Sequence, residues 1–257
     1  MKPAITDLRK HAAQHGITLA NPSNIAESAI QTILTLHEND LLQIKADFDD
    51  ALRQTEAEAY RLYQTHEERY IVEVLELLVK AVIQSNPGIN LDSFPQIFAE
   101  NANLLDRFYL SLGQGRKARA GKAFEDFHNS LFSKLGYPFD SQRVINGKPD
   151  FILPSENHYR NDPMDCIIFT AKRTLRERWR QVVTEGARGR RFFIATIDEK
   201  ITHVQLNEML EHGITIVCPA AIKQTQYRLN ANVLSFKEFF EDYLDPALVR
   251  WQRKGIV

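Results

Sequence analysis

Two side chains of complementary chemistry stand at the ends of two short apolar segments. Asp150 directly precedes the apolar run 151–154, and Lys172 directly follows the apolar run 166–171. If these runs form adjacent strands, the carboxylate and the ammonium group lie at the same end of one sheet. Such a pair suits hydrolysis of a phosphodiester, which needs oxygen ligands for a hard cation and an activated water molecule.

This pair is the core of the PD-(D/E)xK nuclease pattern, in which a second carboxylate stands two residues before the lysine. That position is Thr170 here, so the plain pattern fails and the second carboxylate must come from elsewhere. The candidates are Glu185, beside the apolar face of the helix expected next, and Glu125, beside Phe124 in an earlier helix. The spacing alone is a weak signal, and a turn-forming Pro-Asp with a surface lysine is the alternative.

Charge is distributed unevenly along a chain whose formal net charge is only −1. Residues 1–100 contain 8 basic and 15 acidic side chains, which leaves 24 basic and 18 acidic side chains in the remainder. The segment 172–191 alone has 8 basic residues and 2 acidic ones. A basic block in a nearly neutral chain indicates a surface for a polyanion, with a solvated helix surface as the alternative.

The composition is that of a globular protein, with 44% hydrophobic and 25% charged residues. The sequence has no apolar run of about 18 residues, so we expect no membrane span. Its first residues lack the apolar core of a signal peptide, and we expect a cytoplasmic protein. Cys166 and Cys218 lie in apolar runs and are expected to be buried thiols in a reducing compartment. The eight histidines lack metal-binding spacing, and we expect them at surface or capping positions.

Hydrophobic spacing predicts a helical N-terminal region over residues 1–110. Apolar residues recur at helical spacing over 41–52 and 71–82, and Asn-Pro-Gly at 86–88 should end the second of these helices. A further helix is expected over 94–110. Gly113-Gln114-Gly115 should then interrupt the pattern before a helix over 116–135, which Gly136 would end.

Residues 111–257 have the pattern of an α/β core. We predict strands over 141–145, 149–153, 165–170, 191–197 and 213–218, with helices over 174–188, 202–211 and 235–244. Strands that alternate with helices after an initial helix predict a mixed β-sheet flanked by helices.

Three segments, 116–142, 147–154 and 171–198, resemble the type II restriction endonucleases of the EcoRII C-terminal domain and PspGI group, which recognise CCNGG or CCWGG. The segments 205–222 and 234–240 also fit that group, so the resemblance covers about half the chain. It implies that 111–257 is a PD-(D/E)xK nuclease core and that 1–110 serves DNA contact or dimerisation. In this group the second carboxylate has moved to the helix after the lysine strand, which accounts for Thr170.

The resemblance also implies roles for individual residues. Asp150 and Glu185 would be Mg²⁺ ligands, Lys172 the catalytic lysine, and Glu125 the acidic residue that completes the site. Base recognition would fall to four residues: Gln114, Arg176, Glu177 and Arg178. Arginine donates two hydrogen bonds to guanine and glutamate accepts one from cytosine, which suits this run. Contacts to DNA phosphates are expected from Arg116, Lys117, Arg119, Arg188 and Arg190.

Members of the group flip the central base pair out of the duplex, which requires a pocket for each base. Tyr60, Arg61 and Tyr63 are the candidates for that pocket, and tyrosines at the edge of a core are the alternative. The implied activity is Mg²⁺-dependent cleavage of double-stranded DNA at a CCNGG-type site, leaving 5′-phosphates and five-nucleotide 5′ overhangs. The implied partners are a second copy of the chain, forming a homodimer, and a cognate DNA methyltransferase in the cell.

Two other functions remain open at this point. A structure-specific PD-(D/E)xK nuclease of repair or recombination would cut branched DNA, but it has no need of the base-reading run 176–178. A non-catalytic DNA-binding regulator on a decayed nuclease fold is the other, although intact Asp150, Lys172 and Glu185 argue against decay.

Overall fold

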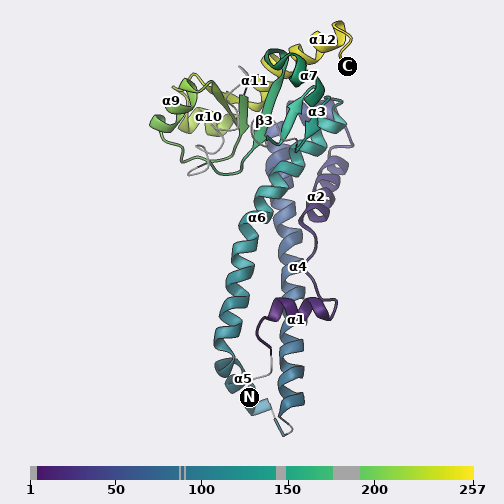
Figure 1. Cartoon of the computed structure of the whole chain (residues 1–257), viewed down its shortest axis with the longest axis vertical. Helices are drawn as coiled ribbons and strands as arrows, with labels where there is room; N and C mark the ends of the chain where they lie inside the picture. Colours follow the sequence, from purple (N-terminus) through teal and green to yellow (C-terminus); the bar gives the residue numbers. More distant parts are fainter. Residues whose placement is uncertain (1–4, 87, 90, 143–148, 176–191) are drawn as a thin grey trace.

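The structure is a computed structural model that describes residues 5–86, 88–89, 91–142, 149–175 and 192–257. An elongated pair of helices extends from an α/β core (Figure 1). The helical region comprises α1 (Leu8–Gln14), α2 (Pro22–Leu36), α3 (Leu41–Ala46), α4 (Phe48–Ser85), the 3-10 turn η1 (Leu91–Ser93), α5 (Phe94–Glu100) and α6 (Ala102–Lys134).

The core contains six strands: β1 (Asp140–Ser141), β2 (Phe151–Leu153), β3 (Ile167–Ala171), β4 (Phe192–Ala195), β5 (Ile214–Cys218) and β6 (Val233–Ser235). Its further helical elements are α7 (Glu156–Asn161), η2 (Pro163–Asp165), α9 (His203–Glu211), α10 (Ala220–Gln226), α11 (Phe236–Phe239), the π-helical turn η3 (Phe240–Leu244) and α12 (Asp245–Arg253). None of the helices in the described part of the chain is long and apolar enough to cross a membrane.

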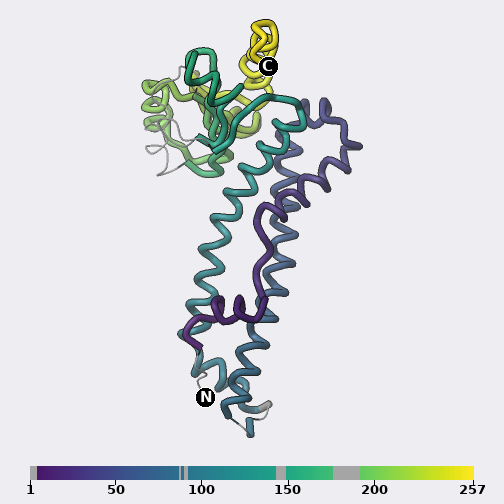
Figure 2. Tube along the Cα trace, turned by 45° about the vertical axis from the view of Figure 1, so that its right-hand side comes forward, coloured from purple at the N-terminus to yellow at the C-terminus, as the bar shows by residue number. Residues whose placement is uncertain are grey.

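Helices α4 and α6 lie side by side and form an arm that projects from the core (Figures 1 and 2). The 38 residues of α4 correspond to about 57 Å of helix. Near the core α2 packs against both helices, and further out α1 lies across them. The far half of the arm is held by an apolar seam that includes Val74, Leu78 and Val82 from α4 with Phe108 and Leu112 from α6. The prediction of a helical N-terminal region is therefore confirmed.

Helix α6 runs without interruption through Gly113-Gln114-Gly115, so the predicted break at this point is wrong. A glycine inside a helix costs about 1 kcal/mol relative to alanine. Here the neighbouring side chains outweigh that cost, because Leu112 is buried against α4 and Arg116 pairs with Glu67 of α4. The predicted division after residue 110 thus falls inside a continuous helix.

The core sheet has the strand order β1-β2-β3-β4-β5-β6. Strands β1, β2 and β3 pair antiparallel, whereas β3, β4, β5 and β6 pair parallel. The predicted mixed sheet flanked by helices is confirmed, and sequence reasoning missed only the short β6 among the described strands. Most of the predicted helix over 174–188 and most of the strand over 141–145 lie outside the described residues, and the described residues 174–175 are not helical.

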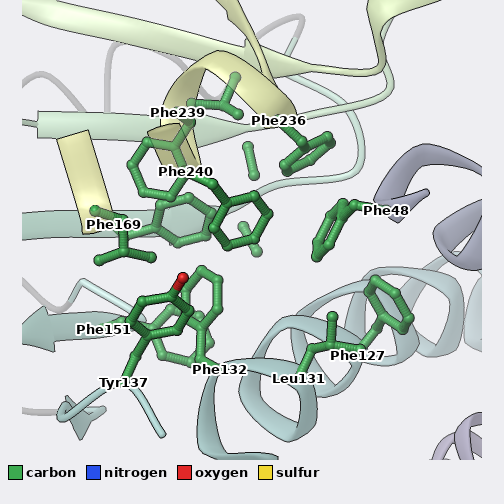
Figure 3. Close-up of a cluster of buried hydrophobic side chains, with 14 of the residues drawn as sticks. Phe48, Phe127, Leu131, Phe132, Tyr137, Phe151, Phe169, Phe236, Phe239 and Phe240 are labelled. Atoms are coloured by element: carbon green, nitrogen blue, oxygen red, sulfur yellow. The ribbon is translucent and has the colours of Figure 1, made fainter. Parts of the chain in front are cut away.

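One face of the sheet carries a cluster of aromatic rings that joins the arm to the core (Figure 3). Phe48 of α4 and Phe132 of α6 pack with Phe151 and Phe169 of the strands and with Phe240 near the C-terminus. The other face is covered by a second apolar cluster that contains both free cysteines. Burial raises the pKa of each thiol to about 12, so both are neutral at physiological pH, as expected for inert buried thiols.

His128 of α6 is fully buried in the aromatic cluster, which corrects the expectation that the histidines lie at the surface. Its ring lies against Phe124, Phe169 and Phe236. Its Nδ1 is 2.7 Å from the carbonyl oxygen of Phe124, and its Nε2 has no hydrogen-bond partner among the described residues. Burial lowers the pKa of His128 to about 4, so the imidazole is neutral in the folded protein.

This neutral histidine predicts a loss of stability in mild acid. Between pH 6.5 and pH 4 the unfolded chain binds a proton at His128 that the folded chain does not bind, so folding weakens as pH falls. From pH 7 to pH 5 we expect this group alone to remove about 2 kcal/mol from the free energy of unfolding. Urea denaturation at both pH values should show this drop in wild type and in the exposed control His66→Gln, but not in His128→Phe. An equal drop in His128→Phe would contradict the assignment.

Candidate active site

The carboxylate of Asp150 and the ammonium group of Lys172 meet at one end of the sheet. Lys172 Nζ lies 2.9 Å from Oδ2 and 3.2 Å from Oδ1 of Asp150. Asp150 is buried, with only 4% of its surface exposed. The backbone N–H of Ala171 donates to Oδ2 over 2.8 Å. The structure thus brings together the two residues that the sequence placed at the ends of neighbouring strands.

The pairing of β2 with β3 produces this arrangement. Phe151 lies opposite Phe169 in the antiparallel register, which puts Asp150 opposite Thr170. The fully buried Thr170 accepts a hydrogen bond through Oγ1 from the backbone N–H of Asp150, over 3.3 Å. In place of the second carboxylate of the plain pattern, the chain therefore has a hydroxyl that supports the Asp150 backbone.

The backbone after β3 is held by the end of β4. The N–H of Lys172 donates to the carbonyl of Ala195 over 2.9 Å, and the Thr196 hydroxyl donates to the carbonyl of Arg173 over 3.3 Å. The N–H of Leu175 donates to Oδ2 of Asp198 over 2.9 Å. Sequence reasoning missed Thr196 and Asp198, because a polar residue after a buried strand is no specific signal.

Six of the predicted site residues lie outside the described residues: Arg176, Glu177, Arg178, Glu185, Arg188 and Arg190. Their roles in base recognition, metal binding and phosphate contact stay predictions.

Glu125 is linked to Asp150 through a residue that sequence reasoning missed. Gln142 donates through its side-chain amide to Oε1 of Glu125 over 2.7 Å, and through its backbone N–H to the carbonyl of Asp150 over 3.1 Å. Gln142 has φ +57°, a left-handed conformation that non-glycine residues rarely adopt. One residue thus connects the two acidic residues that the sequence predicted to share a site.

The carboxylates of Asp150 and Glu125 suit a hard divalent cation. Asp150 and Glu125 offer carboxylate oxygens, which are the ligands that Mg²⁺ prefers. A positive group already contacts both oxygens of Asp150, namely the ammonium of Lys172. The chemistry of the described side chains therefore fits a bound Mg²⁺ with lysine beside it.

Another acidic group lies near the C-terminal helix. Ligand atoms of His158, Asp162 and Asp165 come within 4.8 Å of one another. Asp165, however, already pairs with Arg250 at 2.6 Å and with Lys254 at 3.1 Å. Burial would raise the pKa of Asp165, but hydrogen bonds from Arg250, Lys254 and His158 outweigh it and hold the pKa below its usual range. We assign this group to anchoring α12.

A polar network lies between the two arm helices. Buried Glu67 of α4 accepts from the Tyr63 hydroxyl over 2.8 Å and pairs with Arg116 of α6 at 2.7 Å. The guanidinium of Arg119 stacks 4.0 Å from the centre of the Tyr63 ring. Burial and the hydrogen bond to Glu67 raise the pKa of Tyr63, which stays a neutral phenol. Arg116 and Arg119, predicted to contact phosphates, thus have partners inside the arm.

A cavity of about 330 Å³ opens beside this network, between α2, α4, α6 and the end of β3. Its lining includes five of the predicted DNA-binding residues: Tyr60, Tyr63, Arg116, Lys117 and Arg119. Arg61, the remaining candidate for a base pocket, instead pairs with Glu58 at the helix surface over 2.7 Å. Gln114 is exposed on α6, one turn before Lys117.

Comparison with known proteins gives two curated relatives. The type II restriction enzyme SsoII of Shigella sonnei is 30% identical over 148 residues, in an alignment that covers 53% of this chain and 48% of SsoII. The type II restriction enzyme EcoRII of Escherichia coli is 30% identical over 139 residues, 51% of this chain and 34% of EcoRII. The matched part of the chain thus spans about half or less of the length of these relatives.

Solved structures share the fold. A structure described as metal-depleted Ecl18kI in complex with uncleaved, modified DNA superposes with a TM-score of 0.77 at 23% identity, covering 96% of this chain and 83% of Ecl18kI. A PspGI–substrate DNA complex superposes with a TM-score of 0.61 at 23% identity, covering 90% of this chain and 96% of PspGI. The structural likeness therefore extends well beyond the predicted core, into the helical arm.

The family comparison covers one arm helix, α6, as well as the sheet. The model described as EcoRII C terminal matches residues 83–240, which include all of α6 and all six strands. This match covers more than half of the chain. It begins upstream of residue 116, the first residue of the resemblance found in the sequence. The chain belongs to the EcoRII C-terminal family.

Proposed function

We propose that this chain is a type II restriction endonuclease that cleaves both strands of DNA at a CCNGG-type site in the presence of Mg²⁺. The observation that carries the proposal is the Asp150–Lys172 pair at the sheet end, in a chain of the EcoRII C-terminal family. The names of the relatives support it, since SsoII and EcoRII are type II restriction enzymes. The fold is also that of Ecl18kI and PspGI, both known in complex with DNA.

In this proposal Asp150, Glu125 and Glu185 hold Mg²⁺, which when bound supplies positive charge that activates water and offsets the charge of the phosphate. Asp150 is oriented for this role by the N–H of Ala171. Lys172 orients the attacking water through its ammonium group, which also stabilises charge on the phosphate. The water oxygen gives up a proton to solvent and bonds to phosphorus, the bond to the 3′ oxygen breaks, and that oxygen takes up a proton from solvent. The products are a 5′-phosphate and a 3′-hydroxyl.

Recognition is assigned to Gln114, Arg176, Glu177 and Arg178. Gln114 and Glu125 stand eleven residues apart on α6, which is three helical turns and about 16.5 Å along one side of the helix. One helix can therefore present a recognition residue and a site carboxylate to the same DNA. A two-fold symmetric site and staggered cuts that leave five-nucleotide 5′ overhangs call for a homodimer with one active site per strand. In the cytoplasm a cognate methyltransferase would protect the host DNA.

The cavity beside the arm network is our proposed pocket for a flipped base. Exposed Tyr60 offers a ring on which a base can stack, and Arg116 and Lys117 are near enough to meet its phosphate. Arg61 would have to leave Glu58 and turn toward the cavity to take part. Tyr63 is buried beneath Arg119 and serves as the support of the pocket.

The chemical assignment predicts a separation of cleavage from binding. Lys172→Ala and Asp150→Asn should lose cleavage by about a hundredfold or more, because each removes a charge from the reacting centre. Specific binding of a CCNGG duplex in Ca²⁺ should remain within about threefold of wild type, since neither residue reads a base. The matched control is Lys237→Ala, which removes an exposed lysine of α11. Cleavage at the wild-type rate by Lys172→Ala would overturn the assignment.

The pocket predicts a fluorescence signal from the central base. A duplex with 2-aminopurine at the centre of the site should brighten when wild type binds in Ca²⁺, because the base leaves the stack. Tyr60→Ala should weaken cleavage about tenfold through lost stacking and change the emission of the bound base. Tyr109→Ala, which removes another exposed tyrosine of the arm, is the control. A bound duplex with unchanged fluorescence in wild type would exclude base flipping.

A further inference from the structure

An ion pair joins the helical arm to the residue that follows the site lysine. Arg173 Nε lies 2.8 Å from Oε1 of Glu56, although the two residues are 117 positions apart in the chain. Glu56 belongs to α4, and Arg173 stands directly after Lys172. The Glu56 side chain is 20% exposed and that of Arg173 is 42% exposed, so the pair is partly shielded from water.

Arg173 is held from two sides, at its backbone by the sheet and at its side chain by the arm. On the sheet side, Ala195 and Thr196 bind the backbone of Lys172 and Arg173. On the arm side the described contact is the carboxylate of Glu56.

Glu56 itself is held at a defined distance from the sheet. The first turn of α4 is anchored in the core, where Phe48 packs in the aromatic cluster. In the same turn, Asp49 accepts from the N–H of Ala220 over 2.7 Å. Two turns of helix separate these anchors from Glu56, so its carboxylate is supported by a rigid element.

The cavity beside the arm gives Glu56 a particular electrostatic role. Four cationic side chains line that cavity, namely Arg116, Lys117, Arg119 and Arg173, and Glu56 is the one carboxylate among the described residues that line it. Glu67 already pairs with Arg116 and Arg119, so Glu56 is the lining carboxylate that is left to pair with Arg173. Without Glu56, Arg173 would lose its described contact with the arm, and the segment next to Lys172 would be held from the sheet side alone.

We propose that Glu56 is a positioning residue for the reaction: it holds Arg173 and thereby keeps Lys172 at Asp150. This inference rests on the proposed nuclease function and deepens it by linking the arm, where DNA would bind, to the reacting centre. Partly exposed ion pairs contribute little to folding stability. Loss of the pair should therefore change the chemical step while leaving the fold intact.

The test is single-turnover cleavage at saturating enzyme, set beside binding in Ca²⁺ and thermal unfolding. Glu56→Gln should slow the cleavage rate constant about tenfold, because small displacements of a reacting group are costly. The dissociation constant in Ca²⁺ and the melting temperature should stay at wild-type values. Arg173→Gln should have the same effect, and the double variant should be no slower than either single one. Arg173→Lys, which keeps the charge, should recover much of the rate.

Glu73→Gln is the matched control, because it breaks an ion pair with Arg69 on the same helix, away from the sheet. Wild-type cleavage by Glu56→Gln would overturn the inference while leaving the proposed function in place. So would a slower rate that comes with weaker binding and a lower melting temperature, since that result indicates a structural role. A wild-type protein that does not cleave DNA at all would remove the proposed function and this inference with it.

Discussion

The buried negative charge of Asp150 is the constraint on which the site depends. A carboxylate removed from water is costly unless charged or N–H donors meet it, and here the Ala171 amide and the Lys172 ammonium do so. Both donors come from the end of β3, so the pairing of β2 with β3 places the acid and compensates its charge in one step. A second carboxylate at fully buried Thr170 would add another anion beside the first. The hydroxyl found there supports the Asp150 backbone without adding charge.

The sequence predicted the site best where chemistry and local pattern coincide. The apolar run that follows Asp150 and the apolar run that precedes Lys172 predicted two strands whose polar neighbours share one end of the sheet. Local pattern failed at Gly113-Gln114-Gly115, because the packing of distant α4 decides whether that helix continues. It also could not predict Gln142 or Glu56, whose roles arise from contacts between segments far apart in the chain. Such contacts follow from the assembled fold rather than from any spacing of residue types.

The arm and the core act as one structure through a few defined contacts. The aromatic cluster around Phe48 fixes the base of α4 on the sheet, and α6 continues from the arm directly into that cluster (Figure 3). The buried Glu67 network then sets the spacing of the two arm helices beside the cavity. The same two helices thus provide the surface proposed to receive DNA and carry Glu56 and Glu125 toward the site. In the proposed function, recognition and chemistry are therefore coupled through α4 and α6.

The most direct test of the proposed function is digestion of unmethylated plasmid and phage DNA in Mg²⁺, with run-off sequencing of the ends. The proposed function predicts discrete fragments with five-nucleotide 5′ overhangs at CCNGG-type sites, and the end sequences would define the central base pair. A smear, or cleavage confined to branched DNA, would contradict sequence-specific cleavage and indicate a structure-specific nuclease. Binding to specific sites without any cleavage would contradict the catalytic role of Asp150 and Lys172.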